Sequence, residues 1–223
     1  MTDPHADAPI VRAGPTGATA PLAAIALHGR GAGPEDMINL IKAVGAVDVA
    51  IFAPTASGNS WYPPSFLAPH AALEPHLSSA LNAIDRAFDA AAAEGFANER
   101  IVLIGFSQGA CISLEHTARR GRRVRQVLGL SGGLLGTADL DAPPADDLYG
   151  HAPKAFTYTT RLDGLPIHLG CHEEDPHIPL RRVRESEAVL TALGAACSMA
   201  IAPGPGHALA EADVTALRRA LTP

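Results

Sequence analysis

Short apolar segments alternate with longer amphipathic ones along most of the chain. The short segments are apolar at nearly every position, which is typical of parallel strands covered by helices on both faces. We expect such strands at residues 23–27, 49–53, 101–105, 124–130, 167–170 and 198–202, with a short edge strand near 10–12.

The longer segments carry apolar residues three or four positions apart, as one face of a helix requires. Between residues 71 and 94, for example, Leu77, Leu81, Ile84 and Phe88 form such a stripe. Helices are expected at residues 34–44, 71–94, 108–119, 180–193 and 209–221. Alternation of strands with helices predicts an α/β fold with a mostly parallel central sheet and helices on both faces.

The domain organisation follows from length and composition. The chain has 223 residues, which suits one domain. We expect residues 1–20, rich in Pro, Gly, Ala and Thr, to be an N-terminal tail or edge strand, and residues 21–223 to form a single domain. The stretch 132–164 has the composition of a long loop, and no insertion is large enough for a lid domain.

Charge and hydropathy narrow the class of protein. The net charge of −6 argues against a nucleic-acid binder. No apolar run approaches the roughly 18 residues of a membrane span, so no stable membrane insertion is expected. The first residues lack the basic and apolar regions of a signal peptide, and three scattered cysteines indicate no disulfide framework. We therefore expect a cytoplasmic protein.

The strongest chemical signal is the segment IVLIGFSQGAC at residues 101–111, where a strand, the motif G-x-S-x-G and an apolar helix follow one another. In this arrangement Ser107 lies in a tight corner between strand and helix, and its hydroxyl projects from the edge of the sheet. The helix N-terminus favours negative charge that develops there. Ser107 is therefore the candidate nucleophile.

A serine hydroxyl needs a base, and the base needs a carboxylate that orients it. Asp175 follows a predicted strand and precedes Pro176, which favours an extended backbone. Glu173 and Glu174 are competitors that spacing alone does not exclude. His207 lies in a Gly/Pro loop before the last helix, downstream of both other groups. We expect Asp175 and His207 to complete a triad with Ser107.

Catalysis of this kind also needs donors for the oxyanion. One is the backbone N–H of Gln108, which follows the nucleophile, and the other comes from a loop after an early strand. The glycine-rich sequence HGRGAG at residues 28–33 fits that loop, and we assign the donor to the Arg30 backbone.

These motifs together resemble the phospholipase/carboxylesterase family of α/β-hydrolases, which includes acyl-protein thioesterases and small bacterial carboxylesterases. The matching segments are LHGRG at 27–31, GFSQGA at 105–110, LSGG at 130–133, DPHIPL at 175–180 and GH at 206–207. The resemblance implies the α/β-hydrolase fold, the same triad and oxyanion hole, a Trp-containing substrate loop at 59–62 and a homodimer. Arg30 departs from eukaryotic thioesterases, which usually have an apolar residue there.

The expected activity is hydrolysis of short- to medium-chain carboxylic esters through an acyl-enzyme. Trp61, Phe66 and Leu134 are expected to line an apolar acyl site. Thioesters, lysophospholipids or lactones are alternative substrates for the same triad, and a non-catalytic binding module is a further alternative. No cofactor is expected, because ester hydrolysis by a serine triad needs none. No metal site is expected, because His172, His177 and the nearby acids show no recognised ligand spacing.

Overall fold

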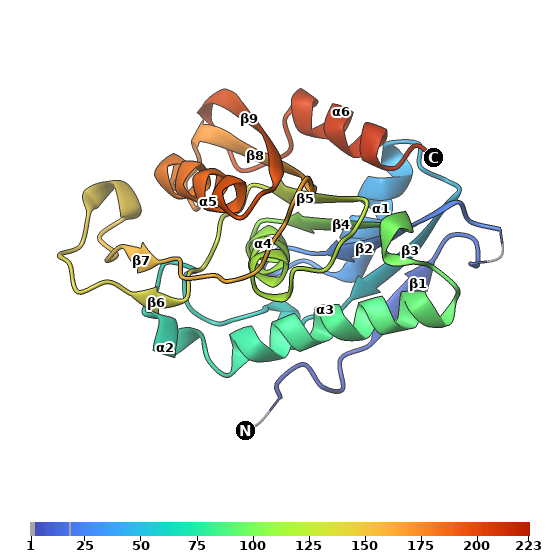
Figure 1. Cartoon of the computed structure of the whole chain (residues 1–223), viewed down its shortest axis with the longest axis horizontal. Helices are drawn as coiled ribbons and strands as arrows, with labels where there is room; N and C mark the ends of the chain where they lie inside the picture. Colours follow the sequence, from blue (N-terminus) through green and yellow to red (C-terminus); the bar gives the residue numbers. More distant parts are fainter. Residues whose placement is uncertain (1–2, 18) are drawn as a thin grey trace.

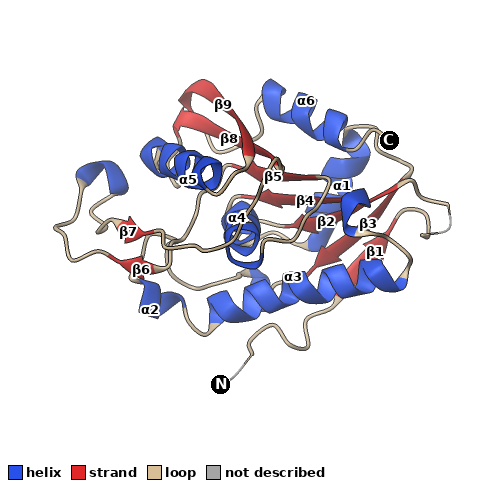
Figure 2. Ribbon diagram, viewed as in Figure 1, coloured by secondary structure: helices blue, strands red, loops and turns tan. Residues whose placement is uncertain are grey.

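The computed structural model describes residues 3–17 and 19–223, and its core is a seven-stranded sheet in the order β1-β3-β2-β4-β5-β8-β9 (Figures 1 and 2). Strand β1 pairs antiparallel with β3, and the other neighbours are parallel. The strands are β1 (Ile10–Ala13), β2 (Leu22–Leu27), β3 (Val49–Pro54), β4 (Ile101–Phe106), β5 (Gln126–Leu130), β8 (Pro166–Glu174) and β9 (Ala196–Pro205).

Helices cover both faces of this sheet. Helices α1 (Pro34–Ala43) and α6 (Glu211–Ala220) contribute Ile41 and Leu217 to one apolar core, where α1 packs on β2 and β3 and α6 on β5 and β8. Helices α3 (His76–Ala93), α4 (Gln108–Arg120) and α5 (Leu180–Ala192) contribute to the core on the other face. The predicted α/β fold is confirmed, and the described residues form no large additional domain.

Three predicted elements differ from the structure by more than two residues. Strand β8 continues to Glu174, so residues 171–174, expected in the loop before Asp175, belong to the strand. The helix expected at residues 71–94 is interrupted, giving α2 (His70–Leu73) and α3. Glu74 is extended there because Pro75 disfavours a helical residue before it and lacks an amide for the helix ladder. Strand β9 is longer than expected and is an edge strand, so side chains such as Met199 are exposed rather than covered on both faces.

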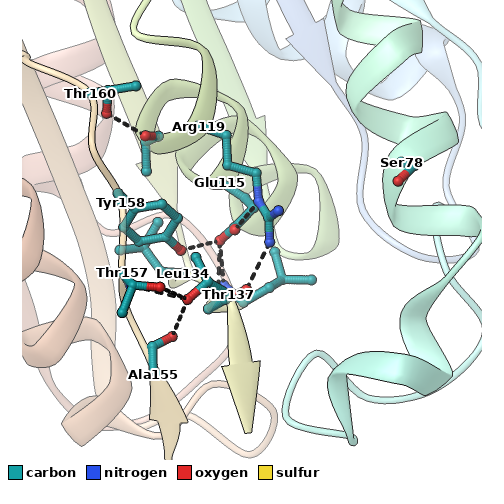
Figure 3. A network of polar contacts seen from close by, with 12 residues as sticks. Ser78, Glu115, Arg119, Leu134, Thr137, Ala155, Thr157, Tyr158 and Thr160 are labelled. Atoms are coloured by element: carbon teal, nitrogen blue, oxygen red, sulfur yellow. Dashed lines mark hydrogen bonds and ion pairs between the residues drawn. The ribbon is translucent and has the colours of Figure 1, made fainter.

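The segment expected to be a loop, residues 132–164, contains the short strands β6 (Ala138–Asp139) and β7 (Lys154–Ala155) and the 3-10 helix η3 (Asp146–Leu148). Two other 3-10 helices are η1 (Ser57–Asn59) and η2 (Asn98–Arg100). The fully buried Glu115 of α4 accepts hydrogen bonds from Arg119, the Tyr158 hydroxyl and two loop amides (Figure 3). This carboxylate therefore fixes the chain that leaves β5 against α4.

The N-terminal segment lies against the domain through β1 and through His5, whose side chain is fully buried. Residues 1, 2 and 18 of the predicted tail lie outside the described residues. Within 3–17 and 19–223, no helix combines the length and apolar character that crossing a bilayer requires.

Candidate active site

Ser107 lies in the corner between β4 and α4, with backbone angles of φ 54° and ψ −119°. This positive φ is strained for a residue with a side chain. The flanking glycines make the corner possible: a Cβ on Gly105 would collide with the Gly109 carbonyl, and one on Gly109 with the Leu27 carbonyl. The Ser107 amide donates to the Leu130 carbonyl at 2.8 Å, which fixes the corner to β5.

The register of the sheet brings three distant segments together. Ser107 follows β4, Asp175 follows β8 and His207 follows β9, and these parallel strands have their carboxyl ends at one edge. The Ser107 Oγ lies 2.8 Å from His207 Nε2, and His207 Nδ1 lies 2.8 Å from Asp175 Oδ2. The structure thus places the three predicted residues in one hydrogen-bonded chain.

Asp175 is 3% exposed and fully hydrogen-bonded. Its Oδ1 accepts the amides of His177 at 2.8 Å and Ile178 at 3.0 Å, which leaves Oδ2 for His207. Burial alone would raise the pKa of Asp175, but the bonds from His207 and the two amides lower it below its usual value. The carboxylate is therefore ionised at neutral pH and oriented toward the imidazole. Glu173 and Glu174 are exposed.

The loop before α6 holds His207 over Ser107. A Cβ on Gly206 would collide with the His172 ring, so glycine permits this close approach without displacing that ring. Behind the loop, Asp213 of α6 caps the Ala210 amide at 3.0 Å and binds His168 Nε2 at 2.9 Å. These contacts attach the start of α6 to β8, and they fix the point at which the loop ends.

Two backbone amides lie beside Ser107. Leu27 and Gly105 are partners in the β2–β4 register, so the loop at residues 28–33 and the serine corner leave the same sheet edge together. Within the described residues, the Arg30 amide donates to no protein group. The Gln108 amide is in the first helical turn, where no helix carbonyl is available. Both amides are thus free to bind an oxyanion.

The side chains of Arg30 and Gln108 hold the segment after η1. Arg30 donates to the Pro63 and Pro64 carbonyls, both at 2.5 Å. Gln108 is nearly buried: its Oε1 accepts the Trp61 amide at 2.8 Å and its Nε2 donates to the Tyr62 carbonyl at 2.7 Å. Both predicted oxyanion residues therefore also support one wall of the site.

A cavity of about 390 Å³ opens beside Ser107 and His207. Ser107, His207, Arg30, Gln108 and the predicted Phe66 line it, together with Tyr62, Pro63, Pro64, Ser65, Cys111, His177 and Ile178. Trp61 and Leu134, predicted as substrate-binding, are fully buried and outside this lining. The Trp61 indole instead donates to the His28 carbonyl at 2.9 Å.

Sequence reasoning missed Cys111, His177 and Ile178 as lining residues. The last two lie two and three residues after Asp175, so the chain that leaves the acid passes over the site, and this was a usable signal. Burial raises the pKa of Cys111 to about 11, which keeps it a thiol that does not compete with Ser107.

In the described residues, no three His, Cys, Asp or Glu side chains gather as a metal site.

Residues 16–222 match the family model of phospholipase/carboxylesterase. A phospholipase/carboxylesterase from Dyadobacter fermentans is 33% identical, with a TM-score of 0.83 and 96% of each chain covered.

Two more distant structures share the fold. A Bacillus cereus carboxylesterase is 18% identical, with a TM-score of 0.74 over 97% of this chain and 94% of its own. One from Mesorhizobium loti is 16% identical, with a TM-score of 0.70 over 95% and 93%. Among curated proteins, no sequence matches. The chain belongs to the phospholipase/carboxylesterase family of α/β-hydrolases, enzymes that hydrolyse carboxylic esters.

Proposed function

We propose that the protein is a serine carboxylesterase that cleaves short- to medium-chain esters through an acyl-enzyme. The observation that carries this proposal is the unbroken chain from Ser107 Oγ through His207 to the buried Asp175, at 2.8 Å for each step. This geometry matches what nucleophile, base and orienting acid require, and it lies at the wall of a cavity.

In the acylation half, Ser107 Oγ attacks the ester carbonyl carbon while His207 Nε2 takes the hydroxyl proton. The carbonyl oxygen becomes an oxyanion, which the Arg30 and Gln108 amides stabilise. Asp175 holds the Nδ1–H tautomer and stabilises the imidazolium. Collapse of the tetrahedral intermediate breaks the bond to the alcohol oxygen, which leaves with the proton from His207.

In the deacylation half, a water molecule replaces the alcohol. His207 takes a proton from the water as its oxygen attacks the acyl carbon, and the same two amides hold the second oxyanion. The bond to Ser107 Oγ then breaks, and His207 returns its proton to the serine. The product is a free carboxylic acid, and no cofactor enters either half.

The cavity supports a modest acyl group. Phe66, Ile178 and the two prolines supply apolar surface, whereas Arg30, Ser65 and His177 make other parts polar. A volume of about 390 Å³ lies near the lower end of the range for small-molecule sites. We therefore expect acetyl to butyryl esters to react better than long-chain lysophospholipids.

The test is hydrolysis of p-nitrophenyl acetate and butyrate by wild type and by Ser107→Ala. We expect wild type to turn over both esters, with a burst when deacylation is slow, and Ser107→Ala to lose at least about 10³-fold. Equal rates in the two proteins would refute the serine mechanism. Faster cleavage of long-chain lysophospholipids would refute the chain-length assignment.

The alternative substrates need matched pairs. An oxygen ester and a thioester with the same acyl group separate esterase from thioesterase activity, and a lactone of equal size tests ring opening. We expect the oxygen ester to give the highest kcat/KM. A cytoplasmic location and a homodimer remain predictions, which cell fractionation and light scattering would check.

A further inference from the structure

We propose that His5, in the N-terminal segment, is a positioning residue for the oxyanion hole. It acts through the bracing segment, which we define as residues 56–64. The inference rests on the proposed esterase function, because it assigns a role within that reaction. His5 does not line the cavity and forms no hydrogen bond with Ser107, so its effect must pass through the contacts described next.

The His5 imidazole spans the first half of the bracing segment. The Ser57 amide donates to His5 Nδ1 at 3.1 Å, and His5 Nε2 lies 3.0 Å from the Trp61 carbonyl oxygen. Because the amide can only donate, Nδ1 must accept and Nε2 must carry the proton. One neutral ring therefore holds two points of the segment at a fixed separation, and its edge also packs on the indole, with centroids 5.4 Å apart.

The backbone of His5 is itself anchored. Its amide donates to Ser79 Oγ at 2.8 Å, and its carbonyl accepts from Arg86 at 2.6 Å, both on α3. The side chain is fully buried between α3 and the bracing segment. Helix α3 thus holds the His5 backbone, and the His5 side chain holds the bracing segment.

The bracing segment in turn holds the oxyanion loop, residues 28–33, which carries Arg30. The Asn59 carbonyl accepts the Gly31 amide at 2.8 Å, and the Trp61 indole donates to the His28 carbonyl at 2.9 Å. The Ala56 amide donates to His28 Nε2 at 3.1 Å. These three contacts bind His28 and Gly31, which precede and follow Arg30 in the chain. Displacement of the bracing segment would therefore move the Arg30 peptide.

The contact at His28 fixes the direction of the Arg30 amide. Since His28 Nε2 accepts from Ala56, its Nδ1 carries the proton and donates to the Gly29 carbonyl at 2.8 Å. In a trans peptide the Gly29 C=O and the Arg30 N–H point in opposite directions. Holding the carbonyl toward His28 therefore aims the Arg30 N–H away from that ring, leaving it available to the reacting carbonyl.

The other oxyanion donor depends on the same segment. Gln108 binds the Trp61 amide and the Tyr62 carbonyl with its two side-chain groups. Loss of the His5 contacts would free the Trp61 carbonyl, which lies between these two bonded groups along the chain. Both donors are thereby sensitive to one imidazole. His5 holds Ser57 and Trp61, and residues 56–61 are not among the cavity lining, so the effect should appear in transition-state stabilisation and not in substrate affinity.

The test combines kinetics with fluorescence of Trp61, the only tryptophan in the chain. In full-length His5→Ala, we expect kcat for p-nitrophenyl butyrate to fall about tenfold or more, part of the 10²–10³ that loss of an oxyanion donor costs. KM should stay within about twofold, the signature of an interaction made in the transition state. Acrylamide should quench Trp61 more strongly than in wild type.

His5→Gln is the rescue variant, because its amide can again donate to the Trp61 carbonyl; it should recover part of kcat and of the protection of Trp61. His116→Ala is the matched control. His116 is equally buried and binds Asp85 at 3.1 Å, but it lies between α3 and α4, outside the bracing segment. All variants are measured below their melting transitions, and the control should keep wild-type kcat and quenching.

The outcomes separate the inference from the proposed function. Unchanged kcat in His5→Ala, a loss confined to KM, or a loss matched by His116→Ala would overturn the positioning role. Unchanged quenching of Trp61 would overturn it without any reference to catalysis. If wild type were as inactive on esters as Ser107→Ala, the proposed function would fall first and the positioning role with it.

Discussion

Replacing Asp175 by Asn tests whether this carboxylate sets the tautomer of the base. In the native site, Oδ1 accepts two backbone amides, from His177 and Ile178, and only Oδ2 faces His207. An asparagine has one acceptor oxygen and one NH₂ group. The two amides hold the oxygen at the Oδ1 position, so the NH₂ group must face His207 Nδ1.

This orientation reverses the histidine. Facing a donor, Nδ1 must become an acceptor and the ring proton moves to Nε2, the atom that lies 2.8 Å from Ser107 Oγ. Nε2 then has no lone pair for the serine proton. In serine triads this fault costs about 10⁴ in kcat, or about 5 kcal/mol at about 1.4 kcal/mol per tenfold. The fold should be little affected, since two of the three bonds to the side chain remain.

The assay is steady-state hydrolysis of p-nitrophenyl butyrate at neutral pH, with melting temperature measured in parallel. Glu174→Gln is the control, because it removes a carboxylate from the adjacent exposed position. We expect Asp175→Asn to lose about 10⁴ in kcat with KM nearly unchanged, and Glu174→Gln to resemble wild type. A variant at position 175 that keeps a tenth of wild-type kcat would refute the tautomer argument.

Three further predictions follow from other parts of the structure. Arg30→Ala keeps the backbone amide but removes the side-chain contacts to Pro63 and Pro64, so KM should rise several-fold. We expect kcat to fall less than about tenfold, because the oxyanion donor itself remains. A fall of about 10³ in kcat would show that the guanidinium itself acts in catalysis. Gly109→Ala would press a Cβ into the Leu27 carbonyl and should lower the free energy of unfolding in urea by at least about 1–3 kcal/mol. Gly33→Ala, where a Cβ has room, should lower it little, and equal urea midpoints for the two variants would contradict this. Burial lowers the pKa of His116 in the folded protein despite its bond to Asp85, so the unfolded chain binds more protons than the folded one. The free energy of unfolding should therefore be full above about pH 6.5 and fall as the pH drops through the folded pKa. His116→Gln should make the melting temperature less steeply dependent on pH over that range, and an identical slope would contradict the prediction.

The sequence was informative wherever a local pattern has one physical solution. A buried strand with Gly105 near its end, followed by Ser107 and Gly109, indicates a tight corner, and in the structure a Cβ at either glycine would collide with nearby backbone. The order of serine, acid and histidine, each after a predicted strand, then placed three groups at one sheet edge. Register explains this success, since parallel strands have their carboxyl ends together.

The sequence was less informative where contacts join segments distant in the chain. It predicted one helix across Pro75, since the apolar pattern outweighed a single proline. It also predicted that both faces of β9 are covered, because an apolar pattern does not reveal which strand lies at the edge of the sheet. It also treated Trp61 as a substrate contact. In the structure, Trp61 is buried behind the oxyanion loop, because its amide, carbonyl and indole are bound by Gln108, His5 and His28.

The chain by itself determined the fold class and predicted the candidate reactive groups, because hydrophobic period and turn chemistry are local properties. Only the tertiary structure decided how those groups are oriented. His5 lies 56 residues from Trp61, and Asp175 lies 32 from His207. The energy of such contacts exists only once folding has brought the partners within hydrogen-bonding distance, so no local pattern can encode it.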